Sequence, residues 1–311
     1  MSLTQALVIT GPTASGKSAL AYALADRFNV EIVSVDSAQV YTDMDIGTAK
    51  PDQAQQALVP HHLLDIRAPT DPYTAFDFCQ DARRAIDAVQ SRGRLPVLVG
   101  GTMLYLKALR DGIADLPEAD SMIRHEILEI AESQGWPFLH DALRRIDPVA
   151  AARIKPSDRQ RLQRAMEVYR LTGQTLTALQ AKGQLGIGAS LTEVAIMPES
   201  RAQLHHQIEV RFDDMLDRGL VAEVEQLRAK YALHDALPAM KAVGYRQAWQ
   251  FLEGDLGFDV MREKAIIATR QLAKRQFTWL RSFETVKKIS TASLDALLKI
   301  EPVANILIKA S

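Results

Sequence analysis

The sequence has very little cysteine and no long apolar run. Its single cysteine, Cys79, excludes an internal disulfide and suits a reducing compartment. Cys79 shares an expected helical face with Ala82 and Ile86, which predicts a buried, unreactive thiol. No apolar run approaches the roughly eighteen residues that a membrane span needs, and the first expected strand begins too early to leave room for a signal peptide. We therefore expect a cytoplasmic protein.

The sequence also has almost no net charge, no internal repeats and no low-complexity segment. A net charge of −1 over 311 residues gives no global sign of a nucleic-acid partner, so any such sign must come from local clusters. Hydrophobic residues make up 47% of the chain and charged residues 24%, which is typical of a globular protein. The length allows one large domain or two smaller ones.

A glycine-rich segment near the N-terminus carries the strongest chemical signal. The apolar run Ala6–Thr10 is followed by GPTASGKS at 11–18, which fits the P-loop pattern, and then by an Ala- and Leu-rich helical stretch. Backbone N–H groups of such a loop hold a diphosphate, Lys17 adds a charge, and the Ser18 hydroxyl is placed to bind Mg²⁺. The alternative is a turn before a helix, without a ligand. The pattern assigns diphosphate binding to Gly11, Thr13, Ala14, Ser15, Gly16, Lys17 and Ser18.

Strands and helices alternate in the first hundred residues. Runs at 31–35 and 95–99 are typical of buried strands, and a helix is expected from an N-cap at Thr74 to about residue 90. This alternation predicts parallel strands, and therefore an α/β fold with a P-loop NTPase-like parallel sheet. Glycine and proline interrupt the stretch from Met44 to Pro60, where we expect mostly loop.

The pattern changes at about Leu116. Helical patterns then replace strands, including a helix at 159–171 with Ser157 as its expected N-cap, and a glycine-rich segment follows at 183–188. Further along, we expect a strand at 191–197, helices at 201–217, 221–231, 245–252 and 258–283, an edge strand at 284–289, and a helix or strand at 294–309. The sequence thus predicts a core formed by residues 1–115 and 187–311, its second part mostly helical, with a helical insertion domain at 116–186.

Two local clusters of basic residues interrupt the charge balance. The segment 264–281 holds five basic residues and no acid, and the segment 153–170 holds six basic residues and two acids. Each cluster alone is typical of a solvated helix face. Together, one on the core and one on the insertion, they suit a polyanion bound between them.

Asp36 follows the second expected strand and so lies beside the P-loop at the carboxyl edge of the sheet. A carboxylate there is a Mg²⁺ ligand, a capping group or a general base, and position alone does not separate these roles. Thr102 follows paired glycines after the third expected strand, where it caps the next helix or faces the site. His61 and His62 lack a metal-binding spacing, and we expect them to be structural.

Several segments resemble one known family over nearly the whole chain. They are GPTASGKS at 11–18, VDSAQVY at 35–41, MDIGTAKP at 44–51, LVGGTMLYLKAL at 98–109, VGYRQ at 243–247 and RQLAKRQFTWLR at 270–281. Together they resemble the bacterial tRNA dimethylallyltransferases, also called tRNA isopentenyltransferases. The chain carries Thr42 where relatives often carry a basic residue.

The resemblance implies transfer of a dimethylallyl group from dimethylallyl diphosphate to N6 of the adenosine immediately 3′ of the anticodon, in tRNAs that read codons beginning with U. It implies Mg²⁺ as cofactor, Asp36 and Thr102 as catalytic residues, Gln39 as a reader of a neighbouring base, an insertion that binds the anticodon stem-loop, and a monomer. It assigns tRNA contacts to Asp36, Ser37, Ala38, Gln39, Gln160, Arg161, Leu162, Gln163, Arg164, Lys241, Val243, Gly244, Tyr245, Arg246, Lys274, Arg275, Gln276, Phe277, Thr278, Trp279, Leu280 and Arg281.

Two other functions share the P-loop and the sheet. A small-molecule or nucleotide kinase would transfer the γ-phosphoryl group of ATP and would use a basic lid, a role that the insertion can fill. A nucleic-acid-binding NTPase would transfer no group to its partner. Neither accounts both for the DSAQ segment at 36–39 and for the basic helix at 264–281.

Overall fold

The computed structural model describes residues 5–182, 186 and 191–308. It consists of two compact units, which are described separately below. One is formed by Met1–Arg110 together with Ile187–Ser311, and the other by Asp111–Gly186. Apart from Gly186, the glycine-rich segment expected at 183–188 lies outside the described residues.

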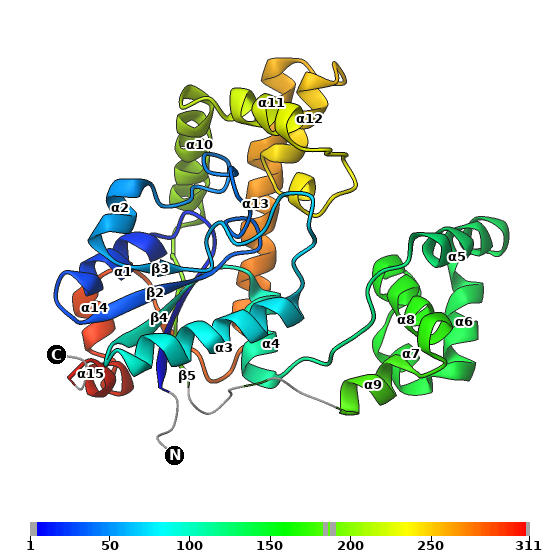
Figure 1. Ribbon diagram of the computed structural model, residues 1–311, viewed down its shortest axis with the longest axis horizontal. Coiled ribbons are helices and arrows are strands. Elements are labelled where there is room, and N and C mark those ends of the chain that lie inside the picture. Colours follow the sequence, from blue (N-terminus) through cyan, green and yellow to red (C-terminus); the bar gives the residue numbers. More distant parts are fainter. Residues whose placement is uncertain (1–4, 183–185, 187–190, 309–311) are drawn as a thin grey trace. The chain divides into compact units, whose positions relative to one another are not determined.

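A parallel β-sheet organises the first unit and confirms the predicted α/β fold (Figure 1). Its spatial order is β3-β2-β4-β1-β5-β6, and every neighbouring pair is parallel. All residues of β1, β2 and β4 are buried, as expected where helices cover both faces of a parallel sheet. The strands are β1 Ala6–Thr10, β2 Val30–Val35, β3 His61–His62, β4 Leu95–Gly100, β5 Leu191–Ile196 and β6 Lys287–Ile289.

Helices cover the two faces of this sheet (Figure 1). Leu24 of α1, Leu297 of α14 and Val303 of α15 share one buried cluster with alternate residues of the strands. The helix α3 contacts β2 and β4, and the alternation of strand side chains places it on the other face. The helices outside the insertion are α1 Lys17–Ala25, α2 Gln53–Leu58, α3 Ala75–Ser91, α4 Met103–Asp111, α10 Arg201–Asp217, α11 Leu220–Lys230, α12 Tyr245–Leu252, α13 Phe258–Ser282, α14 Leu294–Leu298 and α15 Glu301–Ile308, with a 3₁₀ turn at Ala239–Lys241.

The stretch expected to be mostly loop is mostly loop, and it also contains α2, whose N-cap Asp52 forms a capping box with Gln55. The segment expected to be one closing helix or strand forms two short helices, α14 and α15. The two histidines, expected to be structural, form β3. The N-cap predicted at Thr74 is confirmed, with a complete capping box.

The second unit is helical and has a core of its own. Its helices are α5 Ser121–Gln134, α6 Trp136–Ile146, α7 Pro148–Arg153, α8 Arg159–Thr172 and α9 Leu176–Lys182. Apolar side chains of α5, α6, α7 and α8 meet in one buried cluster that includes Ile127, Leu139 and Leu162. Asp158, and not Ser157, is the N-cap of α8, because its carboxylate accepts from the backbone N–H of Arg161 at 3.3 Å.

Cys79 lies in α3 and is fully buried, as predicted. Burial raises the pKa of its thiol to about 12, so it stays protonated and unreactive at neutral pH. Among the described residues, no helix is both long and apolar enough to cross a membrane.

Candidate active site

A cavity of about 620 Å³ opens at the carboxyl edge of the sheet in the first unit. The loops that follow β1, β2 and β4 meet there, because the three strands are parallel neighbours in the sheet. The segment 47–49 and the helices α10 and α13 contribute further walls. The cavity is of ordinary size for a small-molecule site.

The P-loop forms one wall of this cavity and is shaped for an anion. Ala14 and Gly16 both adopt left-handed backbone conformations, with φ of 61° and 87°. Lys17 donates to the carbonyl of Pro12 at 2.6 Å, across its own loop. The buried Ser15 hydroxyl has no hydrogen-bond partner among the described residues and lines the cavity. It therefore keeps an unused hydrogen-bond donor beside the cavity.

Two cations, Lys17 and Arg211, and one carboxylate, Asp36, line the cavity. Burial lowers the pKa of Lys17 to about 7, with repulsion from Arg211 adding to the effect and attraction to Asp36 opposing it. Burial also lowers the pKa of Arg211, which nevertheless stays charged. Attraction to Asp36 and Asp214 opposes the effect of burial on the pKa of Arg211. Lys17 and Arg211 together suit an anionic ligand in the cavity.

Arg211 was not predicted from the sequence. It lies in α10, on the face that carries the buried residues Leu204, Ile208 and Met215. The available signal was a charged residue within an apolar stripe, because such a side chain needs a partner when it is buried.

Asp36 is held by the turn that it caps. Its Oδ1 accepts from the backbone N–H groups of Ala38 at 2.8 Å and Gln39 at 3.3 Å. Its Oδ2 makes no hydrogen bond to any described residue. Thr102 lies alongside, and its hydroxyl accepts from the backbone N–H of Ser37 at 3.1 Å. The structure thus brings Asp36 and Thr102 to the same cavity as the P-loop.

The side chain of Gln39 is fully engaged within the protein. Its amide oxygen accepts from the Ser34 hydroxyl at 2.9 Å, and its amide nitrogen donates to the carbonyls of Thr48 and Ala49 at 3.3 and 3.2 Å. Gln39 therefore ties the turn after β2 to the segment 47–49, which lines the same cavity.

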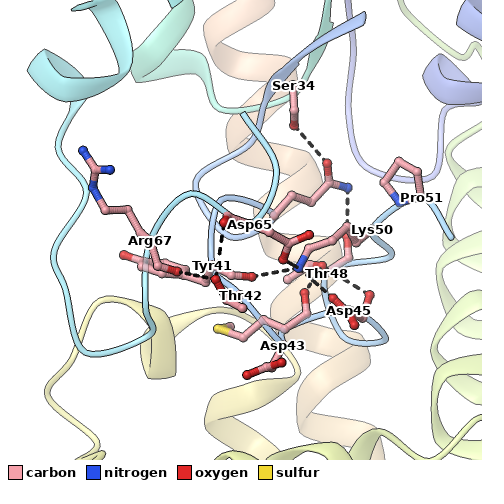
Figure 2. Close-up of polar contacts among 12 residues, drawn as sticks. Ser34, Tyr41, Thr42, Asp43, Asp45, Thr48, Lys50, Pro51, Asp65 and Arg67 are labelled. Carbon is pink, nitrogen blue, oxygen red and sulfur yellow. Dashed lines mark hydrogen bonds and ion pairs between the residues drawn. The ribbon is translucent and has the colours of Figure 1, made fainter. Parts of the chain in front are cut away.

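A buried lysine holds the other end of this segment (Figure 2). The Lys50 side chain is 2% exposed, and its ammonium donates to the carbonyl of Tyr41 at 2.8 Å and to the carboxylates of Asp45 and Asp65, both at 2.6 Å. The two carboxylates are 61% and 41% exposed, so water also solvates them. The ammonium is thus the group that depends on the network.

Replacement of this lysine should destabilise the fold. We expect Lys50→Met to lower the free energy of unfolding by about 2 kcal/mol, because Tyr41 loses a buried donor while the half-exposed carboxylates remain solvated. Urea denaturation measures the change. The matched control is Lys230→Met, which removes an exposed ammonium paired with Asp43 and should have a smaller effect. Equal losses in the two variants would contradict this account.

Glu223 of α11 holds the backbone just before the segment 47–49. Its carboxylate accepts from the backbone N–H groups of Asp45, Ile46 and Gly47, and from the hydroxyl of Tyr245. A Cβ at residue 47 would lie 2.5 Å from the Tyr245 ring, so only glycine fits there. The motifs at 44–51 and 243–247 therefore contact each other and build a cavity wall.

Helix α13 closes the cavity beside the P-loop. Gln276 accepts from the backbone N–H of Thr13 at 2.8 Å and donates to the carbonyl of Gly101 at 2.9 Å. Arg275 and Trp279 of the same helix also line the cavity. Lys274, Arg275 and Arg281 are exposed on its surface.

The residues assigned to tRNA differ in exposure. Leu162, Tyr245 and Leu280 are fully buried, so their side chains offer no surface to an RNA. Lys241, Val243, Arg275, Gln276 and Trp279 line the cavity of the first unit, whereas Gly244, Arg246, Lys274, Phe277, Thr278 and Arg281 do not.

Within the second unit, α8 carries the remaining candidates. Gln160 and Arg161 are exposed and Gln163 is half-buried. The guanidinium of Arg164 already bonds the buried carboxylate of Glu167 at 2.8 Å and the carbonyl of Pro117. This engagement favours a structural role for Arg164 in the helical unit.

Known proteins share this sequence and this fold. The sequence model of the IPP transferase family matches residues 39–283. The chain belongs to the IPP transferase family. Among curated family members, the tRNA dimethylallyltransferase of Thiobacillus denitrificans is 52% identical over 91% of this chain and 90% of its own, and that of Ralstonia nicotianae is 54% identical over 89% and 88%.

Solved structures of the IPP transferase family agree with the fold. The tRNA isopentenylpyrophosphate transferase of Bacillus halodurans is 34% identical, with a TM-score of 0.69, over 99% of this chain and 97% of its own. A eukaryotic dimethylallyltransferase, solved acting on tRNA, is 26% identical, with a TM-score of 0.75, over 97% and 77%. This family member is therefore an enzyme with the predicted architecture.

Proposed function

We propose that the protein is cytoplasmic and transfers a dimethylallyl group from dimethylallyl diphosphate to N6 of the adenosine 3′-adjacent to the anticodon, in tRNAs that read codons beginning with U. The observation that carries the proposal is one cavity that joins a P-loop, Asp36 and a helix with exposed basic residues. In the reaction, the bond between C1 of the dimethylallyl group and the diphosphate oxygen breaks and a C1–N6 bond forms. Diphosphate leaves with the electron pair.

The P-loop side of the cavity suits the leaving group. Lys17 and Arg211 supply positive charge where the diphosphate develops negative charge, and the unpartnered Ser15 hydroxyl supplies a donor. Bound diphosphate favours the charged form of Lys17, so the amine carries its full charge when the leaving group departs.

The residues present also fit Mg²⁺. Among the described residues, no group of three or more His, Cys, Asp or Glu could hold a metal ion. Mg²⁺ in phosphate sites needs fewer protein ligands, because substrate oxygens and water complete its shell. The exposed Ser18 hydroxyl, and Asp36 if it is not the base, fit this role. The ion would add charge neutralisation at the diphosphate.

The Asp36 side of the cavity suits the amine. The lone pair of an exocyclic amine is delocalised into the ring, so N6 is a weak nucleophile and loses a proton as the C–N bond forms. The free Oδ2 of Asp36 accepts that proton, while Thr102 hydrogen-bonds near N6 or the leaving oxygen. An adenine that reaches an enclosed site must leave its stack.

The decisive experiment is mass spectrometry of nucleosides from treated tRNA. Purified protein, dimethylallyl diphosphate, Mg²⁺ and unmodified tRNA should yield an adenosine heavier by one C5H8 unit. Tritium or deuterium in the donor should follow it into the product. ATP consumption without such a product would instead support the kinase alternative.

We also expect Lys274→Ala to weaken tRNA binding through a lost phosphate contact. The exposed Lys274 ammonium would release about one counterion on binding, so the slope of log affinity against log salt should become shallower by about 0.9. Filter binding across a salt series measures this slope. Lys264→Ala, an exposed position on the same helix outside the assigned contacts, is the control and should leave the slope unchanged. Equal slopes for Lys274→Ala and the unaltered chain would contradict the contact.

A further inference from the structure

The side-chain amide of Gln276 joins helix α13 to the P-loop and to the loop before Thr102. The carbonyl oxygen holds the P-loop through the Thr13 N–H, and the amide nitrogen holds the carbonyl of Gly101, directly before Thr102. The residue is 7% exposed, so water competes little for either bond. The amide oxygen and the amide nitrogen each have a partner inside the protein.

The contact with Gly101 is close. A Cβ added to Gly101 would lie 2.5 Å from the amide nitrogen of Gln276. Glycine at this position therefore permits the approach of the amide. Because Thr13 adjoins Ala14, which holds a left-handed conformation, the bond from Gln276 also stabilises the shape of the P-loop.

The helix that carries Gln276 also presents the exposed cations. Lys274 and Arg275 immediately precede Gln276 in α13, and Arg275 lines the cavity. A polyanion bound at these cations restrains the same helical turn that holds the P-loop and the Gly101 loop. Once one ligand has ordered this turn, the other ligand binds without the entropic cost of ordering it.

We propose that Gln276 is a positioning residue that couples RNA binding on α13 to diphosphate binding in the P-loop. The proposal rests on the proposed function. It adds that each of the two ligands strengthens the binding of the other. Direct electrostatics between RNA and diphosphate is repulsive, so without the link each ligand would weaken the other. With the link, each strengthens the other, and by the same factor.

Calorimetric titration of inorganic diphosphate with Mg²⁺ tests the coupling, since this probe allows no turnover. The dissociation constant is measured for the chain alone and for the chain saturated with an unmodified anticodon stem-loop RNA. We expect RNA to tighten diphosphate binding by at least about fivefold in the unaltered chain. The coupling ratio is the dissociation constant of diphosphate without RNA divided by that with RNA. Gln276→Met keeps the side-chain length but removes both hydrogen bonds, and should reduce the coupling ratio to one or below.

Gln271→Met is the matched control, because Gln271 is exposed on the same helix and should keep the ratio. Gly101→Ala displaces the Gln276 amide from the carbonyl of residue 101 and should also reduce the coupling ratio to one or below. This variant tests the proposal if Gln276→Met fails to fold. Any of three results would overturn the proposal. They are a coupling ratio of one or below in the unaltered chain, an unchanged coupling ratio in Gln276→Met, and a coupling ratio in Gln271→Met as low as in Gln276→Met. Product analysis on the same preparations separates this outcome from failure of the proposed function, which would give no prenylated adenosine at all.

Discussion

Replacement of Asp36 by alanine is expected to lower kcat by about 10²- to 10⁴-fold, the usual contribution of a general base. Diphosphate affinity should change by less than about threefold, because the leaving group is held by Lys17, Arg211 and the P-loop. The physical reason is that the two oxygens of Asp36 have different roles. Oδ1 is bound by two backbone N–H groups, and Oδ2 is free to take a proton. Single-turnover rates and calorimetric titration of diphosphate measure the two quantities.

Asp36→Asn separates the base from the cap. An asparagine side-chain oxygen can still accept from the N–H groups of Ala38 and Gln39, so the turn should persist while the proton acceptor is lost. Turnover as low as in the alanine variant, with an unchanged melting temperature, would assign the loss to proton transfer. Equal losses of turnover and of Mg²⁺-dependent diphosphate affinity would instead make Asp36 a metal ligand.

The sheet was predictable because its strands are buried on both faces. Runs such as 31–35 and 95–99 are rich in Ile, Val and Leu, although Glu31, Ser34 and Pro96 interrupt them, and that pattern does not depend on how the helices pack around the strands. The helix α2 gave no such signal, because none of its six residues is buried and no apolar stripe forms. Its capping box was the one available sign. The strand β3 has two residues, too few for any period.

The candidate site divides in the same way. The P-loop, Asp36 and Thr102 each follow a predicted strand, so parallel topology alone places them at one edge. Arg211 and Gln276 reach the cavity only because α10 and α13 pack against that edge. Neither helix carries a local pattern that specifies this packing. Contacts between segments far apart in the sequence, such as Gln276 with Thr13, are visible only in the folded chain.

The second large effect is expected from Lys17, through pH. Its pKa of about 7 in the ligand-free chain means that about half of the molecules carry an uncharged amine at neutral pH. A bound diphosphate favours the charged amine, so binding takes up a proton at Lys17. Affinity should therefore fall as pH rises through 7, by about tenfold between pH 6 and pH 8. Lys17→Met should lose about 100-fold in affinity and lose this dependence, because no charge remains to be gained.

Diphosphate titrates in the same range, so Lys17→Arg is the matched control. A guanidinium stays charged throughout, and its pH profile reports the ligand and Arg211 alone. The ratio of the two affinities isolates the lysine: it should fall with increasing pH, and the measured binding enthalpy should vary with the ionisation enthalpy of the buffer only for the lysine form near pH 7. Parallel profiles for Lys17 and Lys17→Arg would mean that the amine keeps its proton in the empty site. Attraction to Asp36 would then outweigh the effects of burial and of Arg211 on the pKa of Lys17.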